Sequence, residues 1–368
     1  MSALDLRKPV EISDGTYWVG TGSKTFLSRN SYLRVFSGGG KKLNLIMDPG
    51  PPVDLDVISQ KITEVIGSVN RLNMLFVNHQ DPDVVGNLGY LAKMNPQAYI
   101  LATEDTWRLV SLFGLNPHQF KAIERFNKLR VAFPTGHRLQ FVPTPFCHFR
   151  GACMLYDIES RVLFSGDLLG GIASNGLYAT AANWAGIKAF HQLYMPTNDA
   201  LKLAVERIRA LSPAPVMIAP QHGGIITGEL IEDFLTRLEQ LPVGLDILTT
   251  IKDRLPLLLD AVNEIVASSK QILGEEQVSQ TMKLFHSDGS YPAFFALSNE
   301  DRVLEIKGDP LEVMEALVKC LFKGVGEKQK SMLMTRIFRI LMERNLPPFD
   351  SLIAQAVGND VEFLDDIS

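Results

Sequence analysis

The chain has 368 residues, of which 46% are hydrophobic, and its 36 Lys and Arg against 41 Asp and Glu give a net charge of −5. This length suits one large domain and a smaller one, and the acidic balance argues against nucleic acid as an obligatory partner. Three cysteines without a C-x-x-C pair favour the cytoplasm over a disulfide-forming compartment. We find no signal peptide, and no run of about 18 apolar residues predicts a membrane span.

Strands and helices alternate through the first 240 residues. Runs of β-branched and aromatic residues predict the strands, and apolar residues at helical spacing predict the helices. The predicted elements are a strand at 15–22, a hairpin at 30–50, a helix at 55–67, a strand at 71–79, helices at 83–95 and 104–114 around a strand at 97–103, strands at 138–146 and 161–167, a helix at 197–211 and a strand at 214–220. Polar residues collect where strands end, which predicts a layered α/β domain with its site at one rim of the sheets.

The composition changes near residue 240. Residues 243–274 carry apolar side chains at a 3-4 stride, so they predict an amphipathic linker helix that Pro256 kinks or breaks. This helix either packs on its own domain or forms a helix–helix seam between two copies. Residues 275–368 predict a small α+β unit, with a hairpin around Asn299-Glu300 and two helices, the first capped by Asp309.

The segment "LFVNHQDPDVVGNLG" follows a buried strand with three chemically active side chains at alternating positions. His79, Asp81 and Asp83 can point to the same side of a loop at the end of a strand. Such a run also occurs in ordinary surface loops, so by itself it is weak evidence for a metal site.

Three further polar residues stand at the ends of apolar strands. They are His148 in "TPFCHFRGA", Asp167 in "RVLFSGDLLGG" and His222 in "VMIAPQHGGI". Each alone could have only a structural role. Together with the first segment they give three histidines and three aspartates within 225 residues, which is the pattern expected of a dinuclear metal site.

The order of these segments resembles the metallo-β-lactamase superfamily, and most of all its diiron branch, the flavodiiron proteins and their flavin-free oxygen-binding relatives. The matching stretches are "DGTYWVG", "NSYLRVF…LIMDPG", "VNHQDPDVVGNL", "TPFCHFRG", "LFSGDLLGG" and "IAPQHGGI". The resemblance implies an αββα sandwich for residues 1–242. It does not extend to the linker helix or to the small α+β unit.

The metal-binding motif departs from the family pattern at two positions. Hydrolases of the superfamily use H-x-H-x-D-H and flavodiiron proteins use H-x-E-x-D-H, whereas this chain reads His79-Gln80-Asp81-Pro82-Asp83-Val84. Asp81 keeps the carboxylate of the flavodiiron glutamate with one methylene less. Val84 replaces a histidine, so that ligand is lost, and we expect an open coordination position at the second metal.

The resemblance implies a role for each site residue. One metal would be held by His79, Asp81 and His148, the other by Asp83 and His222, with Asp167 as the bridge. The carboxylate-rich set favours two iron ions, with zinc or manganese as alternatives. Asp48 is expected to be either an acceptor that orients a ligand or a plain turn residue. His191 and Tyr194 are expected at the pocket wall, with an ordinary packed histidine as the alternative for His191.

Three functional interpretations follow from the resemblance. The chain after residue 240 lacks the pattern of a flavodoxin domain, so we expect no FMN domain in it. The first interpretation is a diiron protein that binds O₂ or NO and acts in sensing or redox chemistry, with a signalling or redox protein as partner. The second is a flavodiiron-type oxidoreductase that receives electrons from a separate flavoprotein or rubredoxin, and the third is a zinc hydrolase. Because flavodiiron proteins pair their subunits, we also expect a homodimer.

Overall fold

The computed structural model describes residues 4–21, 27–172, 176–250, 255–287, 295–298, 301–307, 309–344 and 346. It divides the chain into two compact units, Met1–Val243 and Gly244–Ser368. The second unit begins one residue after the predicted start of the linker helix at 243, and it contains the rest of that segment and the predicted small α+β unit. Each unit is described by itself below.

The first unit contains a seven-stranded sheet in the order β1 to β7. Strands β1 to β4 are antiparallel, whereas β4 to β7 run parallel to one another. The strands are β1 (Val10–Ser13), β2 (Thr16–Trp18), β3 (Tyr32–Gly38), β4 (Lys41–Met47), β5 (Met74–Phe76), β6 (Tyr99–Ala102) and β7 (Phe120–Ala122).

A second sheet of six strands has the order β13-β12-β11-β10-β9-β8. Among the neighbouring strands that the structure describes in this sheet, β11 and β12 are parallel and the other pairs are antiparallel, so β11 and β12 end at the same edge of the sheet. The strands are β8 (Arg130–Ala132), β9 (Arg138–Pro143), β10 (Cys153–Asp157), β11 (Val162–Gly166), β12 (Met217–Pro220) and β13 (Ile226–Thr227).

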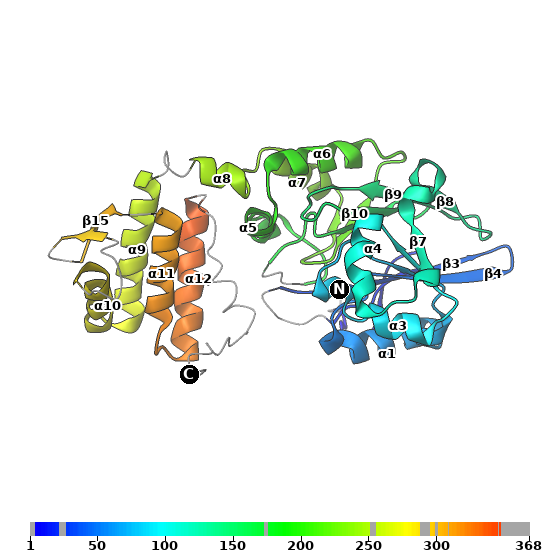
Figure 1. Cartoon of the computed structure of the whole chain (residues 1–368), viewed down its shortest axis with the longest axis horizontal. Helices are drawn as coiled ribbons and strands as arrows, with labels where there is room; N and C mark the ends of the chain where they lie inside the picture. The colour runs from blue at the N-terminus through cyan, green and yellow to red at the C-terminus, as the bar shows by residue number, and fades with distance from the viewer. Residues whose placement is uncertain are drawn as a thin grey trace. The chain divides into compact units, whose positions relative to one another are not determined.

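Helices cover both outer faces of the two sheets. Figure 1 shows α1 and α3 on one side of the strands and α6 and α7 on the other. The helices of this unit are α1 (Leu55–Ile66), α2 (Pro82–Val85), α3 (Leu88–Met94), α4 (Glu104–Val110), α5 (Trp184–Tyr194), α6 (Asn198–Arg209) and α7 (Leu230–Glu239). This arrangement is the predicted αββα sandwich, and the fold class is confirmed.

Two apolar clusters hold the layers together. The cluster between the sheets contains large aromatic side chains that are almost completely buried, among them Trp18, Phe76, Phe141 and Phe164. Burying each of them contributes about 1.5–3 kcal/mol to stability. The other cluster lies under α1, α2 and α3. It therefore fixes α2, the short helix that begins within the H-x-D-x-D segment.

The helix predicted at 83–95 is in fact two helices, α2 and α3. The chain is interrupted at Gly86-Asn87, where a Cβ on Gly86 would lie 2.5 Å from Pro52 Cδ. The Asn87 side chain donates to the carbonyl oxygens of Pro49 and Pro51. These contacts from a distant loop outweigh the helical periodicity of the sequence.

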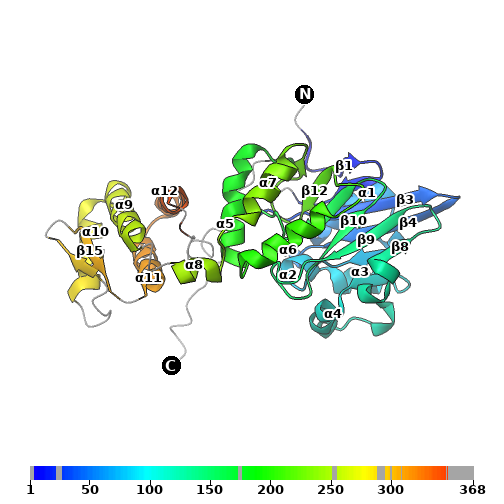
Figure 2. The same cartoon turned by 90° about the horizontal axis from the view of Figure 1, so that it is seen from above.

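The second unit is built on α9 (Leu255–Leu273). This helix packs against α10 (Glu275–Ser287), α11 (Pro310–Phe322), α12 (Glu327–Glu343) and strand β15 (Val303–Ile306), as Figure 2 also shows. Strand β14 (Phe295–Leu297) pairs with β15 in an antiparallel hairpin. The expected turn at 299–300 lies outside the described residues.

One local prediction in this unit is confirmed, and another stays a prediction. Pro256 is the second residue of α9, but residues 251–254, between α8 (Leu245–Thr250) and α9, lie outside the described part of the chain, so a break before Pro256 is not tested. Asp309 caps α11 by accepting a hydrogen bond from the backbone N–H of Glu312 at 3.1 Å. The apolar side chains of Leu258, Val262 and Ile265 on α9 are fully buried inside the unit.

Candidate metal centre

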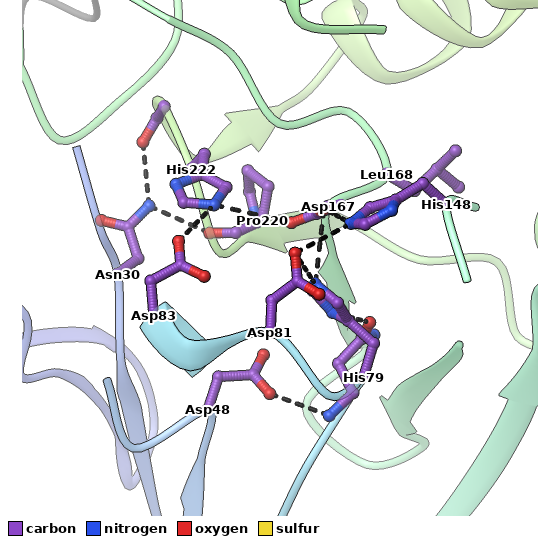
Figure 3. A network of polar contacts seen from close by, with 12 residues as sticks. Asn30, Asp48, His79, Asp81, Asp83, His148, Asp167, Leu168, Pro220 and His222 are labelled. Carbon is purple, nitrogen blue, oxygen red and sulfur yellow. Dashed lines mark hydrogen bonds and ion pairs between the residues drawn. The ribbon is translucent and has the colours of Figure 1, made fainter. Parts of the chain in front are cut away.

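Four loops bring the six expected ligands together, as Figure 3 shows. Three of the ligands lie in the segment that follows β5 and runs into α2. The others come from the loop between β9 and β10, from the end of β11 and from the end of β12. Because β11 and β12 are parallel, the residues that follow them emerge at the same edge of the sheet. The six side chains are His79, Asp81, Asp83, His148, Asp167 and His222.

A first group of donors is formed by two histidines and two aspartates. The Nε2 atom of His148 lies 3.2 Å from Asp81 Oδ2 and 3.2 Å from Asp167 Oδ2. The Nε2 atom of His79 lies 3.7 Å and 3.5 Å from the same two oxygens. Ligand atoms of His79, Asp81 and His148 all lie within 4.8 Å of one another, which is close enough to share one metal ion.

A second group of donors lies on the other side of Asp167. The Nε2 atom of His222 is 3.2 Å from Asp83 Oδ2 and 3.6 Å from Asp167 Oδ1. Asp167 therefore turns its Oδ2 atom to the first group and its Oδ1 atom to the second. One carboxylate that faces two groups of donors is the arrangement of a bridging ligand.

The chemistry of these donors fits a pair of metal ions. Oδ1 of Asp167 is buried and has no hydrogen-bond partner among the described residues. A buried carboxylate oxygen without a partner is costly unless a cation or a donor satisfies it. Three imidazoles and two carboxylates around the buried carboxylate of Asp167 supply the nitrogen and oxygen donors that iron, manganese and zinc use.

The charges in the site explain the pKa values of its members. Burial alone would raise the pKa of Asp167, but the nearby His79, His148 and His222 lower it to about 2. Burial would lower the pKa of His148, yet its hydrogen bonds with Asp167 and Asp81 raise it to about 10. The carboxylates thus hold protons on the rings in the metal-free protein, and bound metals would replace these protons.

The two most buried candidate histidines are oriented by hydrogen bonds of their Nδ1 atoms. Asn78 donates its side-chain N–H to the carbonyl oxygen of Cys153, so its Oδ1 atom accepts a hydrogen bond from Nδ1 of His79 at 3.0 Å. Nδ1 of His222 donates to the carbonyl oxygen of Ser28 at 2.8 Å. Both rings therefore turn Nε2 to the carboxylates, which raise the pKa of each ring and hold on Nε2 the proton that a bound metal would replace.

Asn78 is a functional residue that the sequence reasoning missed. The available signal was its place directly before His79 at the end of a strand. A Cβ on Gly166 would lie 2.1 Å from Asn78 Cγ, so the glycine before Asp167 leaves the space that the Asn78 amide fills. Asn78 thus links the segment that carries His79 to the strand that carries Asp167.

Asp48 lies behind the centre and acts on the backbone. Its Oδ1 atom accepts a hydrogen bond from the backbone N–H of Asn78 at 2.9 Å. Burial raises the pKa of Asp48 to about 6. Asp48 therefore fixes the chain next to His79 and does not contact the imidazole ring through a hydrogen bond.

The two expected pocket residues have different surroundings on α5. The ring of Tyr194 is half-buried and lies 6.0 Å from that of His148. His191 is fully buried, and both of its ring nitrogens bond to the backbone, at Ile187 and Leu169. Burial lowers the pKa of His191 to about 4, so its ring is neutral at neutral pH.

Val84 is also fully buried and packs in the apolar cluster under α1.

The fold and the site define the class of the protein, which is a diiron-type member of the metallo-β-lactamase fold. Residues 27–223 match the family described as "ODP family beta lactamase". The match covers more than half of the chain, and the chain belongs to this family.

Solved structures with the same fold support this assignment. The chain is similar to the apo state of the chemotaxis sensor ODP from T. denticola, with a TM-score of 0.55 and 25% identity over 66% of this chain and 97% of that one. It is also similar to the "peroxy diiron species of chemotaxis sensor ODP", with a TM-score of 0.54 and 25% identity over 66% of this chain and 99% of that one.

Among curated relatives, the chain is 24% identical to a nitric oxide reductase from Moorella thermoacetica over 59% of this chain and 57% of that one. It is 29% identical to diflavin flavoprotein A 1 from Synechocystis over 27% of this chain and 17% of that one. The chain thus spans less than two thirds of the length of these relatives. In the described part of the chain, no helix has the length and apolar character needed to cross a membrane.

Proposed function

We propose that this protein binds O₂ or NO at a dinuclear iron centre and uses this binding in sensing or in redox chemistry. The observation that carries the proposal is the position of Asp167 between two groups of donors. His79, Asp81 and His148 would hold one iron ion, and Asp83 and His222 would hold the other. Asp167 would bridge them through Oδ2 at 3.2 Å from His148 and Oδ1 at 3.6 Å from His222.

Iron is favoured by the donor atoms and by their charge. Three carboxylates nearly balance the charge of two ferrous ions, and the oxygen-rich set shifts preference from zinc toward iron or manganese. When bound, a pair of ferrous ions would supply a coordination position for O₂ or NO and could give up to two electrons to O₂. Zinc and manganese remain the alternative occupants of the same residues.

The two halves of the centre offer different numbers of protein ligands. The first half contains four residues, counting Asp167, and the second half contains three. Val84 stands where a further histidine would complete the second half, and its buried apolar side chain supplies no donor. We infer that the second half leaves room for a small ligand.

The relatives support a sensory or redox role. A protein described as a chemotaxis sensor aligns over nearly its whole length with this chain. A relative described as a nitric oxide reductase aligns over 57% of its length. The residues described after Val243 form α-helices and one hairpin. We propose that this unit serves a signalling or redox partner.

The test uses full-length protein made in iron-replete cells and kept anaerobic. We expect about two iron ions per chain, and a lasting visible band when O₂ is added to the reduced protein without sustained oxygen uptake. Repeated turnover with an added flavoprotein donor would favour the oxidoreductase instead. A colourless, zinc-filled protein that cleaves an ester-type substrate would contradict the proposal and favour the hydrolase.

A further inference from the structure

The turn that carries the bridging carboxylate is held from behind by α5. The backbone N–H of Leu169, two residues after Asp167, donates to Nε2 of His191 at 3.0 Å. Leu169 is buried and has a φ of +63°, a left-handed conformation that is unfavourable for leucine. A conformation of this kind persists only where the surrounding contacts impose it.

The hydrogen bonds of His191 permit one tautomer only. Because the Leu169 N–H must donate, Nε2 of His191 must be unprotonated. Nδ1 then carries the proton and donates to the carbonyl oxygen of Ile187 at 2.7 Å, one turn earlier in the same helix. The ring therefore has a fixed direction and connects α5 to the turn.

The same turn has contacts with both halves of the centre. The backbone carbonyl oxygen of Asp167 accepts from the N–H of Gly170 at 2.8 Å, which closes the turn at the residue that carries the carboxylate. The N–H of Gly171 donates to the carbonyl oxygen of His222 at 3.2 Å. A shift at Leu169 would therefore move the bridging carboxylate and the backbone of His222 together.

We propose that His191 is a positioning residue of the metal centre: by accepting from the Leu169 N–H it fixes the turn that aims both oxygens of Asp167 at the two groups of histidines. This inference rests on the proposed dinuclear centre and adds a residue that contacts neither metal. Its role differs from that of a pocket wall, because the ring makes both of its hydrogen bonds to the backbone.

Two amide substitutions separate the two hydrogen bonds of the ring. An asparagine amide reaches about as far as Nδ1 of histidine, and a glutamine amide about as far as Nε2. His191→Asn can keep the bond to Ile187 and loses the acceptor for Leu169. His191→Gln can keep that acceptor and loses the bond to Ile187. Both variants place a neutral amide at the same buried position, so each is the control for the other.

The experiment is an anaerobic titration of each full-length variant with Fe(II) against a chromogenic chelator, repeated with Zn(II). We expect His191→Asn to lower metal affinity about 10- to 100-fold, as loss of a residue that orients a ligand does. We expect His191→Gln to stay close to the wild type. Equal affinities in all three proteins, or equal losses in the two variants, would overturn the proposal.

The titration also separates this proposal from the proposed function, because it needs no O₂. A wild type that binds zinc but not iron would contradict the diiron function, and the zinc titration would still decide the role of His191. If His191→Asn does not fold, ring ¹⁵N shifts of the zinc-loaded wild type give the answer. A proton on Nε2 of His191 would exclude the bond from Leu169 and overturn the proposal.

Discussion

Oδ1 of Asp167 lies 3.6 Å from Nε2 of His222, and no hydrogen-bond donor in the described part of the chain reaches this buried oxygen. The other oxygen of the same carboxylate lies 3.2 Å from Nε2 of His148. The two histidines come from loops 74 residues apart, since 222 − 148 = 74. A single aspartate at the end of β11 thus joins two sets of donors that the sequence keeps far apart.

This position makes the loss of Asp167 different from the loss of any other ligand. We expect Asp167→Ala to remove both metal ions, because each half of the centre loses a donor. Asp83→Ala should empty only the half that contains His222. Metal analysis of the two purified variants checks this difference. If Asp167→Ala kept both ions, the assignment of the bridge would be wrong.

Gly166 offers a test of the packing behind the centre. Its φ is +60°, and an added Cβ would lie 2.1 Å from Asn78 Cγ, whereas Gly40, with a φ of +71°, has nothing within 4 Å of that position. We expect Gly40→Ala to cost about 1–2 kcal/mol of stability from its backbone conformation alone. Gly166→Ala should cost more than this and should also lower the iron content, because it displaces the amide that holds His79.

Urea denaturation and metal analysis of both glycine variants measure the difference. The stability lost in Gly40→Ala, at the exposed hairpin, measures the cost of the backbone conformation. The additional stability lost in Gly166→Ala measures the clash with Asn78. Equal losses of stability with normal iron content in both variants would show that the Asn78 amide has no role in holding the centre.

The sequence predicts the six candidate ligands that the structure brings together, but not the residues that orient them. His79, Asp167 and His222 stand at the ends of apolar strands, and this pattern is local, so it is readable in one sequence. The role of Asn78 depends on its bond to the carbonyl oxygen of Cys153, 75 residues later. The role of His191 depends on Leu169, 22 residues earlier in the chain. The hydrophobic periodicity of the sequence cannot predict such contacts, because they form only when the sheets and α5 pack together.

The same limit applies to the helix predicted at 83–95. Its apolar spacing is helical on both sides of Gly86, and this local signal was correct for α2 and α3 separately. The break depends on Gly50, whose carbonyl oxygen accepts from the backbone N–H of Asn87 and whose N–H donates to the carbonyl oxygen of Val84. Tertiary contacts therefore determine the boundary between α2 and α3, which the hydrophobic periodicity of the sequence does not show.

Lys61 on α1 should make stability depend on pH above neutrality. It is buried, donates to the carbonyl oxygens of Leu6 and Gly20, and lies over the Trp18 ring. Burial lowers its pKa from 10.5 to about 8. Between these values the unfolded chain binds more protons than the folded protein, so stability rises with pH.

The measurement is urea denaturation of the wild type and of Lys61→Met at pH 7.5 and at pH 9.5. The shift in pKa predicts that the wild type gains about 2 kcal/mol relative to the variant over this interval. Comparing the two proteins removes the contribution of every other titrating group. A parallel change in both proteins would mean that Lys61 keeps its ordinary pKa in the folded state.

The last prediction concerns the subunit contact. The sequence predicts a homodimer, with either the first unit or the helix α9 as its interface. On α9, Leu258, Val262 and Ile265 are fully buried within the second unit, so they are not available to a second copy. We therefore expect the dimer contact to lie on the first unit.

A chain that ends at Val243 keeps all six proposed ligands and both apolar clusters, so it should fold, hold its metals and still dimerise. Light scattering at micromolar concentration compares it with the full chain. A dimeric full chain and a monomeric truncated one would place the contact on the second unit, and a monomeric full chain would exclude the dimer.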